Sequence, residues 1–145
     1  MAFVKKEENF KCTAKQLFDI LSDYESYPDF LADVKGISIL KSTKTYKIIE
    51  YTVAIIKNVT YQLRVKEKKN KEITWTLESG LLFKSLEGSW VLKESKTKKG
   101  TTDVIYEVEM KLKFFAPKLI EKTLVEVNLK TMMKSFKKRV KQLYG

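Results

Sequence analysis

The 145-residue sequence contains no histidine and a single cysteine. Without histidine, a serine or cysteine nucleophile lacks its usual general base, and the common nitrogen and sulfur ligands of zinc are missing. The carboxylates of Asp19, Asp23, Asp29 and Asp33 lack the ligand spacing and the glycine of a calcium loop. We therefore expect no metal, no cofactor and no enzymatic activity, while a buried Asp or Glu acting as an acid or base stays open.

Long apolar runs are also absent. None reaches the roughly 18 residues that a membrane-spanning helix requires, and the N-terminal residues lack the apolar centre of a signal peptide. The lone Cys12 cannot form an internal disulfide, which fits a reducing compartment. With 43% apolar residues and only two prolines, residues 1–145 are typical of one folded domain. We expect a cytoplasmic protein, with peripheral contact at the inner face of a membrane as a further possibility.

Arginine is scarce although the formal net charge is +11. Only Arg64 and Arg139 occur, and every other basic residue is a lysine. Base-edge readout and bidentate phosphate contacts favour arginine, and no helix-turn-helix, zinc-finger or aromatic RNA-binding signature is present. We expect no sequence-specific DNA partner. Lysines that only solvate the surface and a polyanionic partner both stay open.

The first third of the sequence predicts one strand and two short helices. Residues 2–11 predict the strand. Thr13 and Gln16 have the spacing of a capping box and predict a short helix that ends near Asp23. Pro28 suits the start of a second short helix.

From residue 34 to residue 112 the apolar residues recur at every second position, which is typical of half-buried strands. Short connections that contain asparagine or glycine separate these segments and favour antiparallel hairpins. We expect a meander of six to seven antiparallel strands with one face toward the solvent and one toward a core.

One long amphipathic helix of about 27 residues, ending near Tyr144, follows the last strand. At 1.5 Å per residue it is roughly 40 Å long and can lie across the whole sheet. A helix about 10 Å wide cannot contact every inward residue of a wide twisted sheet, so we expect an apolar void between them. Its apolar residues recur at three- and four-residue steps, with a slip near Asn128: Leu119, Ile120, Leu124, Val127, Leu129, Met133, Phe136, Val140 and Leu143.

Two motifs and the order of elements resemble a known family. The motifs are Asp23-Tyr24-Glu25-Ser26-Tyr27-Pro28-Asp29-Phe30 and Ser85-Leu86-Glu87-Gly88-Ser89-Trp90. Together they resemble the coenzyme-Q-binding, polyketide-cyclase-like branch of the START (SRPBCC, Bet v 1-like) superfamily, over essentially the whole chain. The resemblance implies an α+β helix-grip fold, in which a curved antiparallel sheet wraps around the C-terminal helix and leaves an elongated hydrophobic cavity.

The resemblance also implies three hypotheses about function. Members of this branch look like carriers or chaperones of polyprenyl quinones such as ubiquinone and of other lipids, which favours a non-catalytic carrier. A relative described as a ribosome-association toxin favours a ribosome- or RNA-associated regulatory protein. The superfamily also includes aromatase/cyclases, but no complete set of their catalytic positions matches this sequence.

The candidate ligand-binding residues lie on the expected dry face of the sheet and on the C-terminal helix. Tyrosine and tryptophan have polar groups that need partners when they are buried, and a largely apolar pocket with a few polar groups is typical of small-ligand sites. Tyrosine hydroxyls could donate to quinone carbonyls or to a lipid head group. Core packing by the same side chains is the alternative. The candidates are Tyr51, Val53, Tyr61, Leu63, Trp75, Leu77, Trp90, Tyr106, Val108, Met110, Leu124, Met133 and Phe136.

A second set of candidates could contact a membrane or a partner. Phe114 and Phe115 are adjacent and cannot both face the same side of the core, and with Lys118 nearby they could touch an anionic bilayer surface. Packing of both phenylalanines at the entry to the helix is the alternative. The apolar run 81–83 could gate the cavity mouth or simply begin the next strand. A basic stretch without acids is the expected contact if the ribosome hypothesis holds: Lys130, Lys134, Lys137, Lys138, Arg139 and Lys141.

Overall fold

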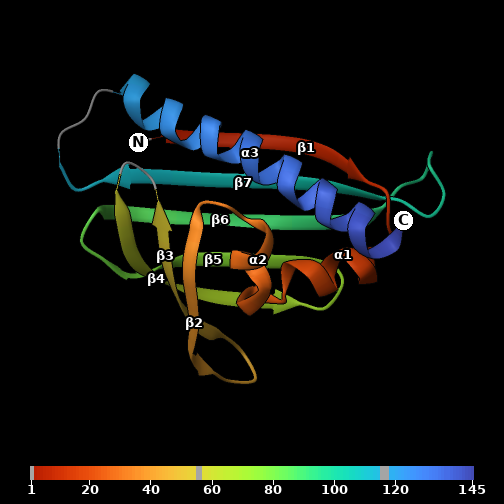
Figure 1. Ribbon diagram of the computed structural model, residues 1–145, viewed down its shortest axis with the longest axis horizontal. Coiled ribbons are helices and arrows are strands. Elements are labelled where there is room, and N and C mark those ends of the chain that lie inside the picture. Colours follow the sequence, from red (N-terminus) through yellow and green to blue (C-terminus); the bar gives the residue numbers. More distant parts are fainter. Residues whose placement is uncertain (1, 55–56, 115–117) are drawn as a thin grey trace.

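The computed structural model describes residues 2–54, 57–114 and 118–145, without the side chains of residues 118–121, 123 and 124. Seven strands form one antiparallel sheet, and a long helix crosses it (Figure 1). The strands are β1 (Ala2–Phe10), β2 (Val34–Ser42), β3 (Lys47–Ala54), β4 (Asn58–Lys68), β5 (Glu72–Gly80), β6 (Phe83–Glu94) and β7 (Thr102–Leu112). The helices are α1 (Ala14–Leu21), the 3-10 turn η1 (Tyr24–Ser26), α2 (Tyr27–Phe30) and α3 (Lys118–Tyr144). The predicted α+β helix-grip architecture is confirmed.

The sheet is a meander that β1 completes. Its strand order is β1-β7-β6-β5-β4-β3-β2, so consecutive strands from β2 to β7 are neighbours. β1 pairs with β7 along its whole length, from Ala2 opposite Met110 to Phe10 opposite Thr102. The helices α1, η1 and α2 therefore connect one edge strand of the sheet to the other.

The predicted capping box begins α1. The backbone N–H of Gln16 donates to Thr13 Oγ1 at 3.1 Å, and the backbone N–H of Thr13 donates to Gln16 Oε1 at 3.0 Å. Leu17 and Leu21 on this helix are fully buried. Each donor satisfied by a cap removes an unpaired group at the helix start, so local sequence alone fixes where α1 begins.

The buried stripe of α3 differs in phase from the predicted one. Val127 is 59% exposed and Leu143 is also exposed, whereas Val125 is buried. At about 100° per residue, Val127 lies about 200° around the helix from Val125 and faces the solvent. The side chains of Leu119, Ile120 and Leu124 lie outside the described residues. The observed stripe keeps a helical period throughout: Val125, Leu129, Met133, Phe136 and Val140.

The sheet divides at one end, where β5 and β6 stop pairing with each other. Their ladder runs only from Glu72 opposite Val91 to Thr76 opposite Glu87. Residues 77–80 stay paired with β4 and residues 83–86 with β7. Both of these outer ladders are irregular there, between Gln62 and Leu63 and between residues 83 and 85. Within the described chain, the tip of this hairpin is thus held by the outer neighbours of its two strands.

Candidate ligand cavity

A cavity of about 240 Å³ lies between the concave face of the sheet and α3. Strands β3 to β7, the segment from α2 to β2, and the middle of α3 all contribute to its wall. Most lining side chains are apolar or aromatic, as is typical of sites for small hydrophobic molecules. The void expected between a wide sheet and one helix is therefore present.

Most of the predicted ligand-binding residues meet at this cavity. Leu77 and Met133 are not among its lining residues, and the side chain of Leu124 lies outside the described residues. Met133 is buried in the core instead. A role for any of these residues in ligand binding stays a prediction. The predicted residues that line the cavity are Tyr51, Val53, Tyr61, Leu63, Trp75, Trp90, Tyr106, Val108, Met110 and Phe136.

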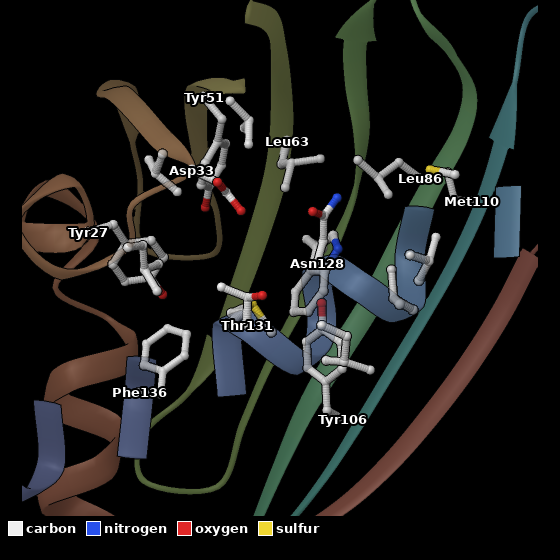
Figure 2. A pocket seen from close by; sticks show the side chains of 18 of the residues that line it. Tyr27, Asp33, Tyr51, Leu63, Leu86, Tyr106, Met110, Asn128, Thr131 and Phe136 are labelled. Atoms are coloured by element: carbon white, nitrogen blue, oxygen red, sulfur yellow. The ribbon is translucent and has the colours of Figure 1, made fainter. Parts of the chain in front are cut away.

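The sequence did not identify the polar part of the wall. Asp33 lines the cavity from the segment before β2, and Asn128 and Thr131 line it from α3 (Figure 2). Ser135 of α3 is also a lining residue. Polar residues on an amphipathic helix are typical of a solvated face, so their role in a cavity is hard to predict. The slip in the apolar pattern at Asn128 was the one available signal. The other lining residues not predicted are Tyr27, Leu31, Ala32, Val34, Val65, Ile73, Phe83, Leu86, Val125, Leu129 and Met132.

The polar residues mark the mouth of the cavity. Of the described lining residues, only Ala32, Asn128 and Thr131 are exposed to solvent, and Asp33 is half-buried. The cavity therefore opens between the segment from α2 to β2 and the middle of α3. In Figure 2, Asp33 and Tyr51 lie across from Asn128 and Thr131.

Aromatic rings form a nearly continuous belt along the wall. The ring of Tyr51 stacks on that of Tyr61, with centroids 5.6 Å apart. The ring centroid of Trp90 lies 4.6 Å from that of Tyr106 and 5.4 Å from that of Phe136, both in edge-to-face geometry. Such pairs contribute about 0.5–1.5 kcal/mol beyond the burial of their area. The wall is therefore stiff on its aromatic sides.

Three tyrosine hydroxyls face this cavity without a protein partner. Those of Tyr51, Tyr61 and Tyr106 make no hydrogen bond to any of the residues described, whereas the Tyr27 hydroxyl donates to the backbone carbonyl of Leu21. Burial raises the pKa of all three phenols, so they are neutral donors at physiological pH. Among the described residues, the buried side-chain atoms without a partner are Asn70 Oδ1 and Ser85 Oγ, so these hydroxyls are not sealed in the core and remain accessible from the cavity. They can donate there to water or to a guest with acceptor atoms.

The first sequence motif, Asp23 to Phe30, supports the segment that leads to the cavity mouth. Tyr24 donates a hydrogen bond of 2.5 Å to Glu67 Oε2, and Lys47 Nζ lies 2.8 Å from Glu67 Oε1. These contacts connect η1 to strands β3 and β4. With the bond from Tyr27 to Leu21, they fix the segment from which Asp33 reaches the mouth.

The second sequence motif, Ser85 to Trp90, forms part of the cavity wall on β6. Leu86 and Trp90 of β6 line the cavity, and Gly88 lies between them. A Cβ atom at Gly88 would lie 2.5 Å from the ring of Trp75 and even closer to the backbone carbonyl of Glu107. Glycine is therefore required here because the indole of Trp75 lies directly against the backbone of β6.

The lining carries little charge. Asp33 is the one acidic residue among the described lining residues, which include no lysine or arginine. A carboxylate or phosphate brought inside would lose its hydration without gaining a cation, which costs several kcal/mol. The cavity therefore suits a neutral guest.

Most of the predicted contact residues that the structure describes are exposed. Phe114 is 55% exposed, while Phe115 and the side chain of Lys118 lie outside the described residues. Lys137 forms an ion pair of 2.5 Å with Glu8, and the Arg139 guanidinium lies 5.1 Å from the ring centre of Phe30. Lys137 is exposed despite this ion pair, and the other exposed basic residues of the predicted stretch are Lys130, Lys134, Lys138 and Lys141.

Solved structures define the class of this fold. A START superfamily protein from Mycobacterium smegmatis matches with a TM-score of 0.89 and 22% identity, over 99% of both chains. The ZhuI aromatase/cyclase from Streptomyces sp. R1128 matches with a TM-score of 0.84 and 13% identity, over 97% of this chain and 93% of that one. The fold is START-like, and proteins of this fold include an enzyme.

Sequence comparison then gives the family. A family model described as polyketide cyclase / dehydrase and lipid transport matches residues 11–137, and the chain belongs to this family. The ribosome association toxin RatA of Pseudomonas aeruginosa is 30% identical, over 91% of this chain and 90% of that protein. The mitochondrial coenzyme Q-binding protein COQ10 of Dictyostelium discoideum is 28% identical, over 95% of this chain and 68% of that protein.

No helix in the described ranges combines the length and the hydrophobicity needed to cross a bilayer.

Proposed function

We propose that this protein is a non-catalytic carrier that binds a neutral hydrophobic molecule, a polyprenyl quinone or another uncharged lipid, between the sheet and α3. The observation that carries this proposal is the cavity itself: about 240 Å³ of mostly apolar space with three unpartnered phenol donors in its wall. Similarity to a coenzyme Q-binding protein supports the quinone alternative.

The donors favour a guest with oxygen acceptors. A quinone ring has two carbonyl oxygens and no net charge, so it matches the hydroxyls of Tyr51, Tyr61 and Tyr106 and the scarcity of charge. Sites for drug-sized ligands typically measure about 300–1,000 Å³. The smaller cavity here would hold the ring and the first part of an isoprenoid chain, with the rest of a long chain passing through the mouth.

The chemistry of the wall supports binding rather than catalysis. General acid–base catalysis works best with a group whose pKa lies near the operating pH. Burial raises the pKa of the three phenols away from that range, and Asp33 lies at the half-buried rim. The described lining therefore offers no pair of groups tuned as acid and base.

Extraction and binding measurements test the carrier hypothesis. Organic extraction and mass spectrometry of protein purified from its native organism should recover a neutral lipid or prenylquinone in near-stoichiometric amount. In titrations, a short-chain quinone should bind more tightly than a fatty acid with the same number of carbons. No extracted lipid together with no binding of added quinone would refute the carrier. Tighter binding of the fatty acid would refute the preference for neutral guests.

The basic face of α3 supports a second candidate, association with the ribosome. Lys130, Lys134, Lys138 and Lys141 are exposed at helical spacing on one face, and a relative is a ribosome association toxin. Contact with RNA phosphates through several lysines is strongly salt-dependent. Sedimentation with ribosomal subunits at near-physiological salt should persist if the contact is specific, and Lys134→Gln with Lys138→Gln should abolish it. Loss of association at moderate salt would leave only general electrostatics.

A further inference from the structure

We propose that one end of the sheet docks on an anionic lipid bilayer through the side chains of Leu81 and Phe114. Leu81 forms the turn between β5 and β6 and is 91% exposed, and Phe114 follows β7 and is 55% exposed. The backbone N–H of Lys113 donates to the carbonyl of Leu82 at 2.9 Å, which holds the two segments together. Figure 1 shows both segments at the same end of the sheet. We call this surface the apolar tip.

Two lysines flank the apolar tip in sequence. Lys84 is exposed three residues after Leu81 and Lys113 is exposed directly before Phe114, and residues 79–86 and 110–114 contain no aspartate or glutamate. Apolar side chains that insert below the head groups, with lysines at the level of anionic lipids, are a known combination for surface binding. Each lysine near an anionic surface adds to the attraction.

The size of the apolar tip favours a bilayer over a protein partner. A stable protein interface buries about 800 Å² on each side, and two exposed side chains from two neighbouring segments offer far less. A bilayer needs no complementary shape, because it accepts any apolar side chain that reaches its acyl chains. Two apolar side chains and two lysines fit weak, reversible membrane contact, whose strength scales with the inserted apolar area and the attraction to anionic lipids.

The apolar tip is also next to the cavity wall. Phe83 and Leu86 lie two and five residues after Leu81 in the sequence, and both line the cavity. They lie on the part of β6 that is not paired with β5. Docking at this end would bring the cavity wall within a few residues of the membrane surface. The docking surface itself does not depend on which guest the cavity holds.

Vesicle sedimentation of the full chain tests this surface. The vesicles contain phosphatidylcholine with about one third phosphatidylserine, at near-physiological ionic strength. Leu81→Ser and Phe114→Ser should each lower the partition coefficient about tenfold, the factor expected when one large apolar side chain is withdrawn from the membrane. Leu143→Ser, at the exposed end of α3 beside Lys141, is the matched control and should bind like the wild type. All three substitutions leave the net charge unchanged.

Several outcomes would overturn the proposal. These are unchanged partitioning of both tip variants, an equal loss in Leu143→Ser, or no binding of the wild type to the anionic vesicles. A smaller sedimentation coefficient of Leu81→Ser without vesicles would also overturn it, because the tip would then join two copies of the chain. Because all three side chains are exposed, thermal melts should match the wild type. The vesicles contain no quinone, so this result is independent of the carrier hypothesis.

Discussion

Replacing a cavity tyrosine by phenylalanine should weaken ligand binding without weakening the fold. In Tyr51→Phe the ring and its stacking on Tyr61 remain, and only a hydroxyl without a protein partner is removed. The ligand-free protein should therefore keep its stability to within about 0.5 kcal/mol. The affinity for a quinone should fall about fivefold, the equivalent of one hydrogen bond of about 1 kcal/mol. Tyr106→Phe should behave in the same way.

Tyr27→Phe is the matched control in the same wall. Its hydroxyl donates to the backbone carbonyl of Leu21, so its removal leaves a buried acceptor unpaired. We expect the free energy of unfolding to fall by about 1–2 kcal/mol. In a chain of this size, each kcal/mol lowers the melting temperature by about 2–4 °C. Quinone affinity of the folded variant should change little.

Two measurements check these expectations together. Thermal melts of the ligand-free variants report stability, and quenching of the fluorescence of Trp75 and Trp90 by added quinone reports binding, because both indoles line the cavity. If Tyr51→Phe destabilises the ligand-free protein as much as Tyr27→Phe, its hydroxyl already has a partner and the reasoning is wrong. Unchanged quinone affinity in both Tyr51→Phe and Tyr106→Phe would show that the guest does not use these donors.

Three further predictions concern the framework. Gly88→Ala places a methyl group against Trp75 and the Glu107 carbonyl. The free energy of unfolding measured in urea should therefore fall by about 1–3 kcal/mol. An unchanged free energy of unfolding would contradict the close packing. Burial raises the pKa of the Cys12 thiol to about 11, so at pH 8 roughly one molecule in a thousand is thiolate and alkylation should be slow until denaturant is added; equal rates in both conditions would show an accessible thiol. Burial also raises the pKa of five tyrosines above the ordinary value of 10.0, and since the unfolded chain loses these protons first, stability is fully present below about pH 10 and falls as the pH rises further. The free energy of unfolding, measured in a series of increasingly alkaline buffers, should show this fall, and a constant value well above pH 10 would contradict it. The five tyrosines are Tyr24, Tyr27, Tyr51, Tyr61 and Tyr106.

Local patterns in the sequence were sufficient to predict the strands and the start of α1. Alternation of apolar residues gives the inward face of a strand directly, because side chains point to opposite faces in turn. The capping box of Thr13 and Gln16 gives the start of α1 from two residues. Long-range information was needed for α3, where Val127 and Val125 are both compatible with a helical period near the slip at Asn128. Only the position of the sheet decides that Val125 is buried.

The residues that line the cavity also include some that local sequence patterns predict and some that they do not. Aromatic residues such as Tyr51 and Trp90 were predictable, because inward positions of strands at the middle of a wide sheet must face the helix or a void. Asp33 and Thr131 were not, because their role depends on where the segment after α2 meets α3 in space. Leu77 shares the alternation of β5 but lies beyond the last pair that β5 forms with β6. No pattern within β5 indicates that its ladder ends there.

The division between β5 and β6 has a consequence for how a molecule could enter and leave. A closed sheet would have to break backbone hydrogen bonds to widen, and a fully laddered hairpin resists that cooperatively. Here the two arms of the turn are secured from outside, by β4 and by β7. Between residues 77–80 and 83–86, the described wall is therefore closed by side chains such as Phe83 and Leu86 rather than by rungs between β5 and β6. Widening this part of the wall for a larger guest would act on those side-chain contacts first.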